Sequence, residues 1–128
     1  MSYHFSKTVT GSWDEARERV TEALKKEGFG ILTEINMQAT LKNKLGVDLR
    51  PYVILGACNP NFAYEALKAE PYIGTMLPCN VIMQETGEGN IEISAIDPVA
   101  SMMAIENEQL TGVASEVRSK LQRAIESL

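Results

Sequence analysis

The stretch CNVIMQETGEGNIEISAI, residues 79–96, decides the fold. Its second half, residues 91–96, alternates apolar and polar side chains with the period of two that is typical of a half-buried strand. The two halves are separated by the glycine-rich run Thr86-Gly87-Glu88-Gly89-Asn90. A turn of this kind between two apolar runs predicts an antiparallel hairpin, with strands over residues 79–85 and 91–96.

Outward from the hairpin, the sequence predicts short strands that alternate with helices. Further strands are expected over residues 3–9, 29–35 and 52–58, and helices over residues 13–27, 37–45, 60–70 and 108–128. Residues 71–78, bounded by two prolines, are expected to form a loop. The resulting order, β-α-β-(α)-β-(α)-β-β-α, predicts an α+β fold in which helices cover one face of a mostly antiparallel five-stranded sheet.

Two of the expected strands carry more detailed predictions. The apolar run of residues 52–58 has no polar face, which predicts a strand in the interior of the sheet. In the strand over residues 29–35, regular alternation places Phe29, Ile31, Thr33 and Ile35 on a single face.

Size and charge exclude several classes of protein. The chain has 128 residues and predicts one domain, residues 1–128. Its net charge of −5 argues against nucleic acid as a partner, because phosphate binding depends on clustered positive charge. We find no signal peptide, and no apolar run approaches the ~20 residues that span a bilayer. We therefore expect a cytoplasmic protein with no membrane partner, whose cysteines stay reduced.

A Cys-Asn pair occurs twice, each time beside a proline: in Gly56-Ala57-Cys58-Asn59-Pro60 and in Leu77-Pro78-Cys79-Asn80-Val81. Both pairs lie at strand ends, so we expect both cysteines at one edge of the sheet. A thiol at a helix N-terminus has a lowered pKa, and the asparagine amides can orient a ligand. The alternative is that the cysteines pack as small apolar side chains and that Asn59 is the N-cap of the following helix.

The other candidate residues carry weaker signals. Asp97, before Pro98, either caps the next segment or joins the same edge of the sheet. His4 is the only histidine and is expected to face solvent, so most hydrolase mechanisms lack a general base. Met102 and Met103 are soft ligands for Cu(I), but packing is the preferred interpretation. We expect no metal site and no cofactor, and an enzyme is less favoured than a binding protein.

Together, the GFGILTEI run at residues 28–35, the GACNP run at 56–60 and the LPCNV run at 77–81 resemble the DUF302 family, a domain of unknown function in small bacterial and archaeal proteins. Asp97-Pro98 is similar to a later element of that family. The resemblance implies a TATA-binding-protein-like α+β architecture and a homodimer, and it implies no reaction. The family's recurring residues match here at Gly56, Cys58, Asn59, Pro60, Gly74, Pro78, Cys79 and Asn80.

Three functions remain open from the sequence. The first is a homodimeric binding module with a small pocket near Cys58, Asn59, Cys79, Asn80 and Asp97. The second is a structural interaction protein without a ligand, with Tyr72, Met76, Met102 and Met103 as dimer contacts. The third is a thiol-based redox protein, in which one cysteine is a low-pKa thiolate and the other resolves it.

Overall fold

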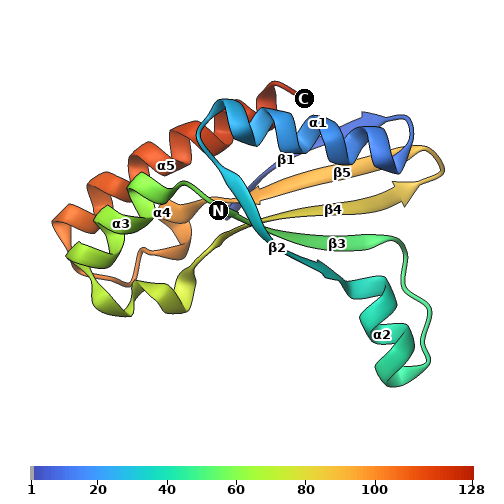
Figure 1. The fold of residues 1–128 in the computed structure, drawn as a ribbon, viewed down its shortest axis with the longest axis horizontal. Coiled ribbons are helices and arrows are strands. Elements are labelled where there is room, and N and C mark those ends of the chain that lie inside the picture. The colour runs from blue at the N-terminus through green and yellow to red at the C-terminus, as the bar shows by residue number, and fades with distance from the viewer. Residues whose placement is uncertain (1) are drawn as a thin grey trace.

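A computed structural model describes residues 2–128 and shows an open five-stranded antiparallel sheet with helices (Figure 1). The elements, in chain order, are β1 (His4–Thr10), α1 (Trp13–Lys26), β2 (Gly30–Asn36), α2 (Met37–Leu45), β3 (Tyr52–Cys58), α3 (Pro60–Ala69), the 3-10 helix η1 (Pro71–Met76), β4 (Cys79–Gly87), β5 (Asn90–Ile96), α4 (Pro98–Ser101) and α5 (Glu108–Glu126). The strands lie in the order β1-β5-β4-β3-β2. The predicted α+β class is therefore confirmed.

The β4–β5 hairpin forms as the sequence predicts. The two strands pair antiparallel, with Val81 opposite Ala95 and Met83 opposite Ile93. These four side chains are fully or almost fully buried under the helices. β3 pairs with β2 on one side and β4 on the other, so its apolar run lies in the interior of the sheet as predicted.

Helices α1 and α5 lie across one face of the sheet (Figure 1) and form the main core with it. Ser12 is the N-cap of α1, and its hydroxyl accepts a hydrogen bond from the Glu15 backbone N–H at 3.2 Å. It ends before Gly28, which has a positive φ of 87°. Side chains such as Leu24 and Leu121 then bury the apolar stripes of the two helices against the sheet.

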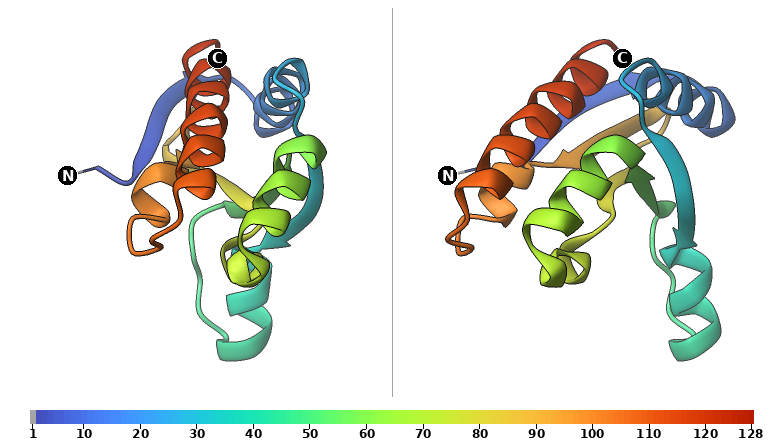
Figure 2. Two further views of the ribbon diagram at one scale, coloured as in Figure 1. Left: turned by 90° about the vertical axis from the view of Figure 1, so that its left-hand side faces the viewer. Right: turned by 60° about the vertical axis from the view of Figure 1, so that its left-hand side comes forward.

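α2 departs from the prediction that the helices stack on the sheet. It projects beyond the β2 and β3 ends of the sheet (Figure 2) and buries none of its residues. Asn36 caps it, and Gly46, with a φ of 68°, ends it. Local signals therefore formed the helix correctly, but its apolar stripe of Met37, Leu41 and Leu45 lies outside both clusters of buried residues.

Two local expectations were wrong. The register of β2 against β3 shifts between Ile31 and Thr33, so that Ile31 lies opposite Ala57 while Thr33 lies opposite Gly56. This β-bulge leaves Leu32 unpaired and turns Thr33 and Ile35 to the face of the sheet away from the helices. The expected loop after Pro71 is instead η1, since proline is compatible with the first position of a helical turn.

Gly56 offers a test of how closely β2, β3 and the chain before β4 approach each other. A Cβ at Gly56 would overlap the Thr33 hydroxyl and lie 2.7 Å from Cγ of Pro78. We expect Gly56→Ala to lower the free energy of unfolding by about 1–3 kcal/mol, because the Thr33 side chain and the Pro78 ring must move to admit the methyl group.

The matched control is Gly30→Ala, also in a strand, where a Cβ meets nothing within 4 Å. Urea unfolding of both variants measures the difference. Equal stability of the two variants would contradict the close approach at Gly56.

Candidate functional site

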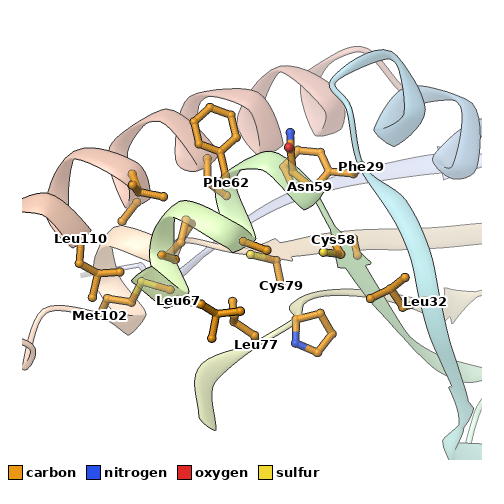
Figure 3. A pocket seen from close by; sticks show the side chains of 18 residues that line it. Phe29, Leu32, Cys58, Asn59, Phe62, Leu67, Leu77, Cys79, Met102 and Leu110 are labelled. Atoms are coloured by element: carbon orange, nitrogen blue, oxygen red, sulfur yellow. The ribbon is translucent and has the colours of Figure 1, made fainter. Parts of the chain in front are cut away.

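A cavity of about 290 Å³ opens between the end of the sheet and helices α3 and α5 (Figure 3). Ala57, Cys58 and Cys79 form its floor on β3 and β4. Its remaining walls come from β2, α3, the chain before β4, α4 and α5, through Phe29, Leu32, Phe62, Ala63, Ala66, Leu67, Leu77, Pro78, Pro98, Met102, Leu110, Val113, Ala114 and Val117. No charged side chain of residues 2–128 lines it, and Asn59 is its one amide.

Small side chains explain why the space exists. Ala63 and Ala66 on α3 and Ala114 on α5 all line the cavity. The helices are held together by a second cluster of buried residues, Ala66, Ile73 and Leu110, of which Ala66 and Leu110 also line the cavity. Asn107 joins them too, because its amide donates to the Ala69 carbonyl at 2.7 Å. A sequence search for reactive residues overlooked these alanines, and their recurrence on two neighbouring helices was the available signal.

Both cysteines lie at the cavity. Cys79 pairs with Ala57 across β3 and β4, which brings it next to Cys58 in the sheet. Cys79 is buried, with 8% of its surface exposed, and Cys58 is half-buried. Burial raises the pKa of the Cys79 thiol to about 11, and the neighbouring Cys58 acts in the same direction. Cys79 is therefore a neutral thiol at pH 7, unlike the low-pKa nucleophile of a redox centre.

Asn59 has a different bonding role from the one expected. It occupies the N-cap position of α3, yet its side chain makes no capping hydrogen bond. Its amide donates instead to the Glu27 carbonyl at 3.2 Å, at the end of α1. Gly28 permits this approach, because a Cβ there would lie 2.9 Å from the Asn59 amide nitrogen. Figure 3 shows the amide directed away from the two cysteines.

Asp97 caps the following segment, the first of its two expected roles. Its carboxylate accepts hydrogen bonds from the backbone N–H of Val99 and Ala100, at the start of α4. The second carboxylate oxygen accepts from Arg118 on α5 at 3.1 Å. Asp97 is thus placed behind the cavity wall, and the neighbouring Pro98 is the residue that lines it.

Asn80 is not brought together with the cysteines. It is exposed and contributes to a separate hollow of about 370 Å³ on the other face of the sheet. His4 lies at the same hollow, exposed as expected, with its Nδ1 2.8 Å from the Ser6 hydroxyl. Alternation along β4 separates Asn80 from Cys79, since adjacent residues of a strand point to opposite faces.

Residues 2–128 contain no cluster of three or more His, Cys, Asp or Glu placed to hold a metal ion. Within the same range, no helix is both long and apolar enough to cross a membrane.

Residues 5–128 match the family model described as domain of unknown function DUF302. The chain belongs to this family. A solved structure, the crystal structure of an uncharacterised conserved DUF302 protein from Bacillus stearothermophilus, shares 28% sequence identity and a TM-score of 0.89, over 98% of each chain. No curated protein matches the sequence. Both positive matches extend over the strands and helices that build the cavity.

The Asn59 amide of this DUF302 domain gives a test that separates bridging from capping. Aspartate is as good an N-cap as asparagine, but its carboxylate has no N–H to donate to the Glu27 carbonyl. We expect Asn59→Asp to lower the free energy of unfolding by about 1–3 kcal/mol, because a buried hydrogen bond is lost.

Asn36→Asp is the matched control for this substitution. The Asn36 side-chain oxygen caps α2 by accepting from the Ala39 N–H at 2.9 Å, so aspartate is expected to replace it without loss. Chemical denaturation of the two variants decides, and an Asn59→Asp variant as stable as wild type would contradict a stabilising bond to Glu27.

The raised pKa of Cys79 predicts a decline of stability at alkaline pH. Below pH 9 the thiol is neutral in both states, whereas between pH 9.0 and about 11 it ionises only in the unfolded chain. Unfolding then becomes more favourable, by up to about 2.7 kcal/mol for two pH units.

Urea unfolding from pH 8 to 11 measures this effect, with Cys79→Ala as the control for lysines and tyrosines that titrate in the same range. The wild type is expected to lose more stability than the variant across this interval. Parallel curves would contradict burial of the thiol.

Proposed function

We propose that this DUF302 protein is a cytoplasmic, homodimeric binding module that holds a small molecule in the cavity beside Cys58 and Cys79. The observation that carries the proposal is the cavity itself, which has about 290 Å³ of space at the end of the sheet. Protein interiors normally leave few voids larger than a water molecule. Ligand pockets begin at roughly 300 Å³ and are mostly apolar, which matches this site in volume and lining.

The residues that line the cavity favour the binding of a ligand over thiol chemistry. A redox centre requires an accessible thiolate, and burial holds Cys79 in its neutral form. The absence of a general base or acid among the cavity-lining residues disfavours hydrolysis at this site. The two cysteines then serve as small polarisable wall residues of a binding pocket.

A structural role without a ligand is the second candidate. It is favoured by Asn59 and Asp97, because the side chains of both residues form hydrogen bonds that join helices. Tyr72 and Met103 support a dimer under either function, because they are 80% and 65% exposed and an apolar surface gains from being covered.

Native mass spectrometry of the protein purified without denaturant tests the proposal. We expect a dimer that carries an additional mass, which is released when the same sample is denatured. Ala63→Leu fills the cavity from α3 and is expected to lower the bound fraction, since its added carbons occupy the ligand's space.

Ala23→Leu is the matched control, because Ala23 is also half-buried on a helix but lies on α1, outside the cavity. A wild-type spectrum without any bound mass would favour the structural role, and a monomer would contradict the dimer.

A further inference from the structure

The chemistry of the cavity walls restricts what it can bind. The walls are hydrocarbon and sulfur, apart from Asn59, whose amide is bonded to the Glu27 carbonyl. Asp97, the buried carboxylate that precedes Pro98, accepts hydrogen bonds from Arg118 and from the start of α4. Neither residue is available to neutralise a charged group inside the cavity.

The buried cysteine does not offer a charge either. Both cysteines are free thiols, and Cys79 remains protonated at neutral pH because it is buried. An ion that entered would lose its hydration without gaining a partner, and burial of an unpaired charge is strongly unfavourable. A neutral apolar molecule loses only contact with water, which favours its entry.

The volume sets an upper limit on the buried part of the ligand. An apolar cavity of roughly 150 Å³ accommodates one benzene molecule. The cavity here has about 290 Å³, so it has room for two fused aromatic rings or a short branched hydrocarbon. A nucleotide or a sugar phosphate is excluded from the interior by size and by charge.

The mouth of the cavity is marked by its two most exposed apolar lining residues. Leu32 on β2 is 67% exposed and Leu67 on α3 is 44% exposed. Figure 3 shows Leu32 on the β2 side of the cavity, apart from the side chains of the helices. Leu32 is the residue that the β2 bulge leaves unpaired, between Ile31 opposite Ala57 and Thr33 opposite Gly56. Bulges of this kind redirect a side chain beside a site.

We infer that the cavity selects an uncharged apolar molecule of about two rings, which enters beside Leu32 and is covered by that side chain. The inference rests on the proposed function, since it names the ligand class of the same cavity. It also gives Leu32 a role in retaining the ligand, which explains a large apolar side chain on an exposed bulge.

Naphthalene and 2-naphthoate are the probes for the ligand class, because they have the same rings and differ by one carboxylate. Binding is followed by NMR shifts of the methyl groups of Met102 and Val113. We expect naphthalene to bind to wild type and to Ala23→Leu, and its binding to be lost in Ala63→Leu. We expect 2-naphthoate to bind at least ~100-fold more weakly, because its charge would be buried without a partner.

Leu32→Ala tests the cover over the mouth, with Leu45→Ala on α2 as a control of almost equal exposure, 69% against 67%. Both variants are expected to keep the wild-type unfolding free energy. Only Leu32→Ala is expected to release naphthalene several-fold faster, as measured by NMR exchange.

The outcomes separate the inference from the proposed function. Binding of 2-naphthoate at the same methyl groups, as tightly as naphthalene, would overturn the ligand class and leave the binding module standing. Equal dissociation rates in Leu32→Ala and Leu45→Ala would overturn the role of Leu32. If neither probe binds and the purified protein carries no extra mass, the binding module itself is wrong.

Discussion

Ala57 on β3 lies opposite Cys79 on β4, and this pair forms the floor of the cavity. The register of β3 against β2 is restricted as well, because Gly56 lies opposite Thr33 and a residue with a Cβ at this position would collide with Thr33 and Pro78. A shift by one residue would turn every buried side chain of β3 to the opposite face. The close contact at Gly56 therefore secures the sheet edge that forms the floor of the cavity.

Above this floor, two amides hold the helices in place. Asn59 joins the start of α3 to the end of α1, and Asn107 joins the start of α5 to the end of α3. Both bonds satisfy backbone carbonyls at helix ends, which have no partner within their own helix. Because the polar side chains are used in this way, the space they enclose is lined by apolar atoms and thiols. The same hydrogen bonds that join the helices thus leave no free charged side chain among the residues that line the cavity.

The chain belongs to the DUF302 family, and the family match covers the residues that line the cavity. The two Cys-Asn pairs contribute different things in this structure. Cys58 and Cys79 line the cavity, Asn59 bridges two helices, and Asn80 faces the opposite side of the sheet. Residues that are neighbours in the sequence therefore serve three different places: the cavity wall, a hydrogen bond between two helices, and the exposed face of the sheet.

The sequence by itself determined the elements whose signals are local. The 79–96 hairpin, the cap at Ser12 and the glycine stop at Gly28 each depend on neighbouring residues, and each formed as predicted. Tertiary structure decided the bulge at Leu32, the free-standing α2, the partner of Asn59 and the space between Ala63 and Ala114. These features depend on contacts between segments far apart in the chain. Periodicity and capping rules describe one segment at a time, so they give no information on which distant atoms meet it.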